Sequence, residues 1–226
     1  MGFPFPENIS SFGADIDFMF WVITILTGVV FVLVEVALVV FLFKYRHREG
    51  QKAFFTHGNQ RLEIVWTAAT VIIVIALGAW SWGLWLDIKD PRRFPAADLE
   101  IGIHVKQFEW NIQYPGADGR LGTADDFTRR NQLHIPVNAK VRGTLESEDV
   151  IHSFYLPNFR LKQDAVPGMK IPIWFEATKT GSYEIACAEL CGLAHYRMKG
   201  SVTVHTAEAF QAWSAQQAAT AAAGGN

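Results

Sequence analysis

The chain has 226 residues, of which 50% are hydrophobic and 19% charged, and its formal net charge at pH 7 is −2. This length allows one domain of ordinary size together with some membrane-spanning helix, but it excludes two large domains. The balanced charge offers no basic excess for phosphates, so we expect no nucleic-acid partner.

Two long apolar segments stand near the N-terminus. The first covers residues 18 to 43 and the second residues 64 to 86. Each is longer than the about 20 residues that a helix needs to cross a bilayer. The second ends in a tryptophan cluster typical of a membrane interface, made of Trp80, Trp82 and Trp85. We therefore predict an N-terminal segment with a two-helix transmembrane hairpin over residues 1 to 90.

The charges that flank the two spans predict their orientation. The residues before Phe18 include acidic side chains but no lysine or arginine, whereas the connection between the spans is basic, with Lys44, Arg46, Arg48, Lys52 and Arg61. By the positive-inside rule the connection is cytoplasmic. The N-terminus and everything after Leu86 then lie on the outer, periplasmic face of the plasma membrane. Because the first residues lack a basic n-region, we interpret the first span as a retained anchor and not as a cleaved signal peptide.

Residues 91 to 206 have a different pattern, with short β-rich runs separated by Pro, Gly and Asn. This pattern predicts an all-β sandwich or barrel. Residues 207 to 226 predict a short amphipathic helix that gives way to a tail of alanine and glycine.

Soft metal ligands are concentrated in one short segment near the C-terminus. Cys187, Cys191, His195 and Met198 place two thiolates, an imidazole and a thioether within a dozen residues. These are ligands that copper prefers. His152, on another predicted strand, could join them in a cupredoxin-like site. Two cysteines taken alone would instead indicate a disulfide in a domain outside the cytoplasm.

Three segments, SEDVIHSFYLPNF, LKQDAVPGM and CAELCGLAHYRMKG, resemble the CuA domain of cytochrome c oxidase subunit II, and the resemblance extends over both spans. It implies a cupredoxin-like domain holding a dinuclear copper centre, with two bridging cysteines. The implied copper ligands are the side chains of His152, Cys187, Cys191, His195 and Met198 and the backbone carbonyl of Glu189. The resemblance also implies that the Glu189 carboxylate binds a magnesium ion shared with subunit I, which suits a hard oxygen ligand.

The resemblance further implies a function in a proton-pumping haem-copper oxidase. Electrons would pass from cytochrome c, or from a cytochrome c domain of an associated complex, through the copper pair to haem in subunit I, where oxygen is reduced to water. The expected partners are subunit I, other oxidase subunits and membrane lipid. Glu63, in a match to the family's E-x-x-W-T signature, would open a proton channel; the alternative is a helix-end acid facing water.

The sequence departs from the family pattern where electrons are expected to enter. Relatives usually read Q-W-Y-W after the second span, whereas Phe108 here replaces the first tryptophan and Trp110 matches the second. We expect electrons to pass near these two rings. Glu148 and Asp149 belong, by resemblance, to an acidic surface that docks cytochrome c, or are ordinary loop acids.

Several alternatives stay open at this point. The loop with Asp118, Asp125 and Asp126 either binds calcium or forms simple turns. Glu35 lies near the middle of the first span, where a charge is costly without a partner. Rival functions are a quinol-oxidase subunit, a copper-containing nitric oxide reductase subunit and a copper-delivery or structural protein.

Overall fold

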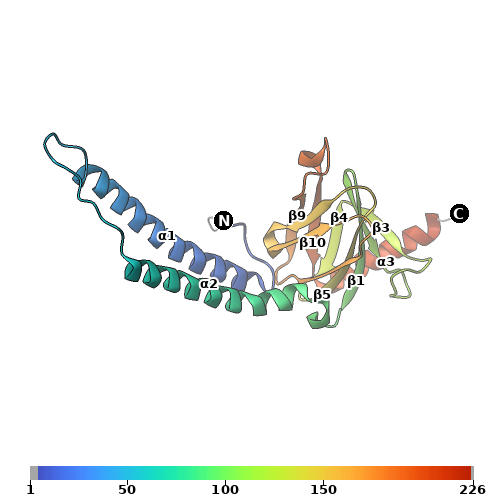
Figure 1. Ribbon diagram of the computed structural model, residues 1–226. Helices are drawn as coiled ribbons and strands as arrows, with labels where there is room; N and C mark the ends of the chain where they lie inside the picture. The colour runs from blue at the N-terminus through green and yellow to red at the C-terminus, as the bar shows by residue number, and fades with distance from the viewer. Residues whose placement is uncertain (1–4, 225–226) are drawn as a thin grey trace. The chain divides into compact units, whose positions relative to one another are not determined.

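The computed structural model describes residues 5 to 224 and divides into two compact units (Figure 1). One unit is Asp15–Trp85. The other joins the residues up to Ala14 with the residues from Leu86 onward. The first unit is helical and the second is mainly β, so each is described separately.

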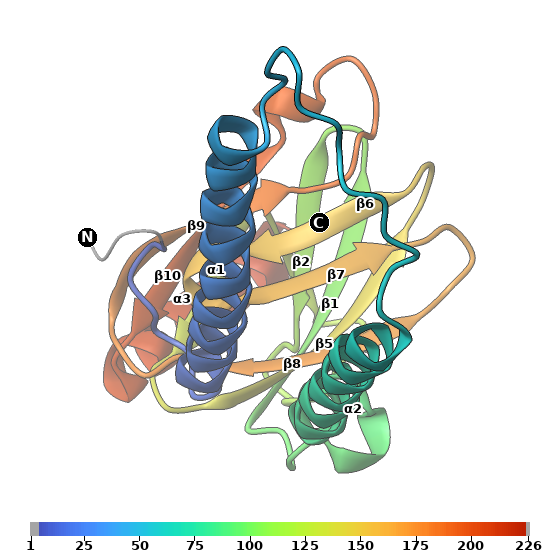
Figure 2. The ribbon, with the colours of Figure 1, turned by 60° about the vertical axis from the view of Figure 1, so that its left-hand side comes forward.

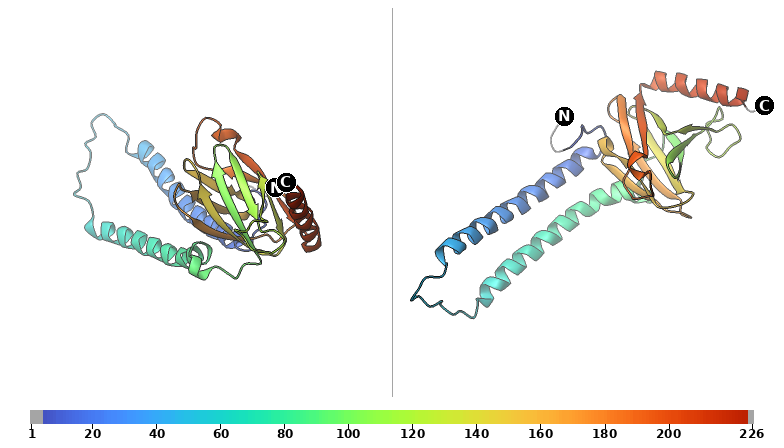
Figure 3. Two further views of the ribbon diagram at one scale, coloured as in Figure 1. Left: turned by 90° about the vertical axis from the view of Figure 1, so that its right-hand side faces the viewer. Right: turned by 90° about the horizontal axis from the view of Figure 1, so that it is seen from above.

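The helical unit consists of two long helices, α1 (Gly13–Lys44) and α2 (Gln60–Lys89). Their apolar stretches have mean hydropathies of 2.9 and 2.2, and both are long enough to cross a membrane. The two helices run alongside each other as the arms of a hairpin (Figure 3), and at one end the rings of Phe18 and Trp80 meet edge to face with centroids 5.8 Å apart. Apolar side chains cover all sides of both helices, which is the surface that lipid and partner helices accept. The predicted two-span hairpin is confirmed.

Helix α2 begins a few residues before its apolar segment, where a side chain caps it. At the start of α2, the Asn59 side-chain oxygen accepts hydrogen bonds from the backbone N–H groups of Arg61 and Leu62, both at 3.1 Å. Such a cap satisfies donors that the first helical turn leaves free.

The β unit is a sandwich of two five-stranded sheets (Figure 2). One sheet has the order β3-β2-β1-β5-β8 and the other β4-β10-β9-β6-β7. In Figure 2, strands β6 and β7 lie across β1 and β2 of the other sheet. The strands are β1 (Leu99–Lys106), β2 (Glu109–Tyr114), β3 (Phe127–Arg130), β4 (Gln132–Pro136), β5 (Lys140–Ser147), β6 (His152–Leu156), β7 (Leu161–Ala165), β8 (Ile171–Glu176), β9 (Gly181–Cys187) and β10 (Lys199–His205). Three short 3-10 turns are η1 (Pro91–Arg93), η2 (Pro157–Phe159) and η3 (His195–Arg197).

The strands alternate between buried and exposed positions, and the buried positions of the two sheets form one core. Each large side chain removed from water contributes about 1.5 to 3 kcal/mol to folding. The core includes Ile101, Ile103, Val105, Trp110, Ile112, Leu133, Ile135, Val141, Leu145, Phe154, Leu156, Ile173, Phe175, Ile185, Val202 and Val204. The predicted all-β sandwich is confirmed.

The residues before α1 belong to the β unit. The backbone N–H of Ile9 donates to the carbonyl of Asn158 at 3.0 Å, and the carbonyl of Ile9 accepts from the N–H of Thr178 at 2.7 Å. The Ile9 side chain is fully buried. Since this arm precedes α1 and the sandwich follows α2, both ends of the hairpin lie on one side of the membrane, in agreement with the charge pattern.

Helix α3 (Ala207–Gly224) follows the last strand and packs on β3, β4 and β10 (Figure 3). Trp213 anchors it, since its ring stacks on His134 with centroids 4.2 Å apart and meets Tyr114 at 5.2 Å. The helix is longer than the short helix predicted, because it continues through the alanines that were expected to form a tail. Alanine is the strongest helix former, so these residues prolong the helix once it has begun.

Candidate metal centre

The predicted metal ligands meet at one edge of the sheet, where β6 and β10 begin and β9 ends. Strand β9 ends at Cys187, which lies opposite Phe154 of β6, and His152 begins β6 two residues earlier on the same face. The N–H of Cys187 donates to the carbonyl of Met198 at 3.2 Å, just before β10 begins. The sheet therefore fixes three of the predicted ligands, and the loop between β9 and β10 supplies the others.

The two cysteine sulfurs form the middle of the cluster. Cys187 Sγ lies 3.8 Å from Cys191 Sγ, in contact but far from the bonding distance of about 2.05 Å of a disulfide. Cys191 Sγ lies 3.6 Å from His195 Nδ1 and 3.7 Å from Met198 Sδ. One sulfur thus has an imidazole nitrogen and a thioether beside it.

The other sulfur has a matching pair of neighbours. Cys187 Sγ lies 4.0 Å from His152 Nδ1 and 3.3 Å from the backbone carbonyl oxygen of Glu189. The ligand atoms of His152, Cys187 and Cys191 all lie within 4.8 Å of one another. Donor separations of this size allow metal bonds of about 2.0 to 2.3 Å to a shared ion. The arrangement can therefore hold a soft metal between the two sulfurs.

The donors differ in their access to solvent. His152, Cys191 and Met198 are buried, whereas His195 is half-buried and the Glu189 side chain is exposed. Burial, reinforced by the neighbouring Cys187 thiol, raises the pKa of Cys191 above its ordinary value. A positive ion between the two sulfurs would relieve this cost, because it stabilises the thiolate form.

Asp149 orients His152, a role that the sequence did not reveal. Its Oδ1 lies 2.8 Å from His152 Nε2, and its Oδ2 accepts the backbone N–H of Gln107 at 2.7 Å. Desolvation raises the pKa of Asp149, but the hydrogen bonds from Gln107 and His152 outweigh it and hold the pKa below its usual range. With Nε2 turned to the carboxylate, Nδ1 is the imidazole nitrogen that faces the sulfurs.

Trp110 lies inside the domain and not at its surface. Its exposed fraction is 0%, and its ring packs edge to face against His152 and Phe154 with centroids 6.3 and 5.3 Å away. The alternation of β2 directs position 110 into the core, and the passage of electrons near Trp110 stays a prediction. Phe108 is half-buried. It borders the loop of residues 188 to 198 between β9 and β10, here called the metal loop, since a Cβ placed on Gly192 would lie 3.3 Å from the Phe108 ring.

Glu63 and Glu35 take no part in this cluster, because both belong to the helical unit. Glu63 is exposed in the first turn of α2, where a carboxylate is favoured by the helix dipole. Glu35 is exposed on α1.

The acidic loop after β2 uses its carboxylates within the loop. Asp125 accepts hydrogen bonds from the N–H of Asp118 and the hydroxyl of Thr123, and Asp126 accepts from the N–H of Gly122 and the amide of Gln113. These bonds are typical of a turn.

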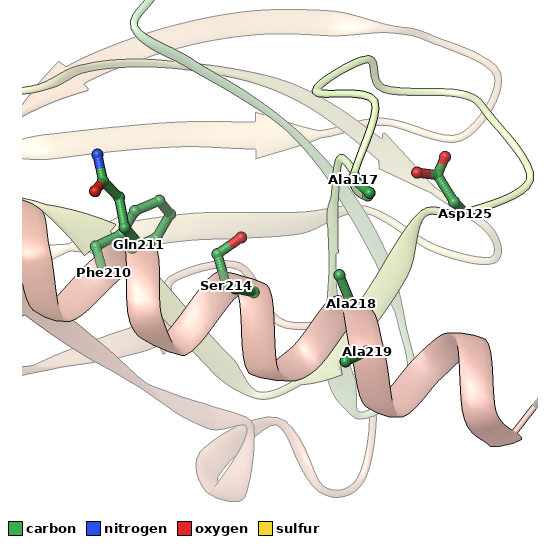
Figure 4. Close-up of a pocket in the computed structure, with 9 residues that line it drawn as sticks. Ala117, Asp125, Phe210, Gln211, Ser214, Ala218 and Ala219 are labelled. Carbon is green, nitrogen blue, oxygen red and sulfur yellow. The ribbon is translucent and has the colours of Figure 1, made fainter.

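A cleft of about 620 Å³ lies elsewhere, between this loop and α3 (Figure 4). It is lined mainly by small side chains, and none of the predicted metal ligands contributes to it. Figure 4 shows Ala218 and Ala219 of α3 opposite Ala117, with Asp125 nearby. The polar residues that line the cleft are Asp125, Gln211 and Ser214. None of the described residues that line it is a histidine, cysteine or methionine, so the donor cluster is the stronger candidate for metal chemistry.

The comparisons with known proteins agree with this geometry. The family described as cytochrome C oxidase subunit II, periplasmic domain, matches residues 106–205, and its transmembrane domain matches residues 1–84. The alternative cytochrome c oxidase subunit 2 of Bradyrhizobium diazoefficiens is 34% identical over 95% of this chain and 83% of its own length. Cytochrome c oxidase subunit 2 of Thermostichus vulcanus is 31% identical over 96% of this chain and 80% of its own.

A solved structure shares the fold of the β unit. The periplasmic domain of subunit II of cytochrome oxidase from Bradyrhizobium japonicum is 32% identical, with a TM-score of 0.50, over 56% of this chain and 98% of the solved chain. Two membrane-spanning helices and a matching periplasmic domain place the sandwich on the periplasmic side. The chain belongs to the family of cytochrome c oxidase subunit II, the membrane-anchored subunit of a haem-copper terminal oxidase.

Proposed function

We propose that this chain accepts electrons for a proton-pumping cytochrome c oxidase by means of a dinuclear copper centre. The observation that carries the proposal is the donor cluster, in which each of two cysteine sulfurs has an imidazole nitrogen and one weaker donor beside it. This pairing offers two equivalent positions for a metal ion around a shared pair of sulfurs.

The donor chemistry suits copper. Thiolate and thioether sulfurs are soft ligands, and imidazole binds copper well. Cys187 and Cys191 would bridge the ions; His152 and the Glu189 carbonyl would complete one position, and His195 and Met198 the other. When bound, such a copper pair takes up one electron, shares it between both ions and releases it to haem in subunit I.

The protein contributes a rigid and largely dry frame. Cys187 and Met198 are tied together by their backbones, and the N–H of Ala188 donates to the carbonyl of Ser153 at 3.0 Å. A frame of paired strands resists the rearrangement that a change of charge would otherwise drive. Electrons therefore move with little reorganisation of the ligands.

We propose that cytochrome c, or a cytochrome c domain, docks near Phe108. The ring of Phe108 is half-buried beside the metal loop, whereas Trp110 packs behind His152 in the core. Phe108 is then the accessible aromatic contact, and Trp110 supports His152 from within.

Two carboxylates of this chain would act together with subunit I. The Glu189 carboxylate is exposed next to the donor cluster and would bind magnesium together with subunit I, since a hard cation prefers oxygen. Glu63, at the start of α2, would open a proton channel into subunit I. Lipid and the membrane helices of the other subunits would cover α1 and α2.

The proposal is tested by measuring electron transfer from cytochrome c to the purified chain, without the other oxidase subunits. The full chain, purified in detergent and loaded with copper, is mixed without oxygen with ferrous cytochrome c, and cytochrome oxidation is followed by stopped-flow absorbance. We expect one cytochrome oxidised per chain, at a rate that falls with ionic strength. Oxidation at the same yield by the Cys191→Ser variant, or none by the copper-loaded native chain, would reject the assignment.

A further inference from the structure

The turn between β1 and β2 contacts both halves of the donor cluster through one residue, Gln107. Its backbone N–H donates to Asp149 Oδ2 at 2.7 Å, and the other oxygen of that carboxylate lies 2.8 Å from His152 Nε2. Its side-chain Nε2 donates to the backbone carbonyl of Cys191 at 2.5 Å. Gln107 thus contacts the His152 side through its backbone and the Cys191 side through its amide.

The metal loop has a matching recess for this amide. Gly192 follows Cys191, and a Cβ at this position would lie 2.6 Å from Gln107 Nε2, so the amide would have to move away. Gly192 also has a φ of +132°, which side chains rarely adopt. Glycine therefore allows both the turn of the loop and the close approach of Gln107.

This contact supports a part of the loop that is otherwise turned toward solvent. Leu190 and Leu193, on either side of Cys191, are 78% and 94% exposed. Two backbone hydrogen bonds tie this loop to the sheet. The N–H of Ala188 donates to the carbonyl of Ser153 in β6, and the N–H of Cys187 donates to the carbonyl of Met198, so both bonds lie where the loop leaves β9 and reaches β10. The amide of Gln107 holds the middle of the loop from a separate pair of strands.

We infer that Gln107 is a positioning residue that fixes the Cys191 segment relative to His152 and so sets the geometry in which copper is bound. The inference rests on the proposed function for its metal, but not for the contact itself. A neutral amide fulfils this role without adding charge beside the thiolates. Loss of the amide donor would leave the Cys191 carbonyl unpaired and the segment free to move.

Gln107→Met separates the two contacts. Methionine keeps the length of the side chain and removes the donor, while the backbone N–H to Asp149 is unchanged. Gln132→Leu is the matched control, because Gln132 is an exposed residue of β4 outside the cluster. Gly192→Ala is a second variant, since the added methyl group displaces the same amide from the other side.

The first measurement needs no metal. Amide hydrogen exchange of the copper-free full chain in detergent is compared among the variants over residues 188 to 198. We expect about fivefold faster exchange in this segment for Gln107→Met and for Gly192→Ala, with the strands unchanged, as the loss of one hydrogen bond implies. Exchange equal to that of the native chain and of the control would overturn the inference.

The second measurement uses the metal. Copper-loaded chains are challenged with a chelator, and we expect copper to leave Gln107→Met about tenfold faster than it leaves Gln132→Leu, the size of effect that supporting residues have on metal sites. Equal rates would overturn the role of Gln107 in the copper site. If the native chain bound no copper, the proposed function would fail, and the exchange experiment would still decide whether Gln107 holds the loop.

Discussion

At the scale of single residues, Asp149 determines how His152 is presented. The carboxylate lies 2.8 Å from His152 Nε2 and so leaves Nδ1 toward the sulfur of Cys187. We predict that Asp149→Ala weakens copper binding about 10- to 100-fold, as loss of a supporting hydrogen bond does in other metal sites. Competition with a chelator measures it. The control is Glu148→Ala, because the Glu148 side chain is exposed and its removal leaves the backbone hydrogen bond from Glu148 to Val105 intact. Equal losses of copper affinity in both variants would contradict the account.

In the proposed function Glu189 would have two roles, since its carbonyl faces Cys187 and its carboxylate is exposed. Glu189→Gln retains the carbonyl, so we predict an unchanged copper content in the assembled oxidase. The neutral amide is a poorer ligand for a hard divalent cation, so magnesium binding weakens. Manganese substituted for magnesium and observed by paramagnetic resonance checks this, with Glu208→Gln as the control. Loss of copper, or full manganese occupancy, would disprove the division of roles.

The sequence predicted the donors but not the residues that support them. Sulfur and imidazole ligands are recognisable by type and spacing in Cys187 to Met198, and their convergence follows from the pairing of β9 with β10. Gln107 and Asp149 carry no such signature. They meet across 42 residues of sequence, and Gln107 reaches Cys191 across 84. Contacts of this kind form only in the folded sandwich, so no local sequence pattern predicts them.

At the scale of elements, the N-terminal arm is part of the periplasmic domain. Ile9 is fully buried, and its backbone joins Asn158 and Thr178. We predict that Ile9→Ala lowers the free energy of unfolding of the domain by about 2 to 4 kcal/mol, through lost burial and the cavity left behind. Near-UV circular dichroism of the full chain in detergent during denaturation measures it. Ser11→Ala, at an exposed position of the arm, should have no such effect; a neutral Ile9→Ala would mean that the arm is dispensable.

The packing of α3 on β4 and β10 is expected to weaken in acid. His134 Nδ1 lies 2.8 Å from His205 Nε2 beneath Trp213. Desolvation, with the charges of His205 and Arg129, lowers the pKa of His134 to about 4, and desolvation also lowers the pKa of His205. In the unfolded chain these groups take up protons near pH 6.5. Between the two values the unfolded state binds more protons, so stability is lost as pH falls.

His134→Phe keeps a ring for Trp213 to stack on and removes this titration. We predict that its melting temperature falls less steeply than that of the native chain between pH 7 and pH 4.5, measured by near-UV circular dichroism. His57→Phe, in the exposed connection between the spans, should follow the native slope. Parallel slopes for all three proteins would show that the histidine pair does not sense pH.

The helices and strands differ in how well the sequence predicted them. Apolar length predicted α1 and α2, and short β-rich runs separated by Pro, Gly and Asn predicted the β domain. Strand β3 follows directly on the loop marked by Asp and Gly, and it is stabilised by a long-range contact, the stacking of Phe127 on Tyr114 with centroids 5.3 Å apart. The few apolar residues of the arm around Ile9 have no period, so its place in the β unit depends on the burial of Ile9 and on its backbone bonds to Asn158 and Thr178.

At the scale of the whole molecule, the chain combines a membrane anchor with a periplasmic domain. The hairpin returns the chain to the side from which it started, so one folded unit contains both the arm and the metal loop. This topology keeps the donor cluster on the periplasmic side, while Glu63 at the start of α2 lies at the other end of the span. Electrons and protons would therefore reach subunit I from opposite faces.

The central claim is that this chain holds two copper ions between two cysteines. The most direct test loads the full chain in detergent with copper and records copper content together with the electron paramagnetic resonance spectrum. We predict two ions per chain sharing one unpaired electron, seen as a seven-line hyperfine pattern, which Met198→Leu retains and Cys191→Ser abolishes. A four-line signal of a single copper ion, or a chain without copper in which Cys187 and Cys191 form a disulfide, would contradict the claim.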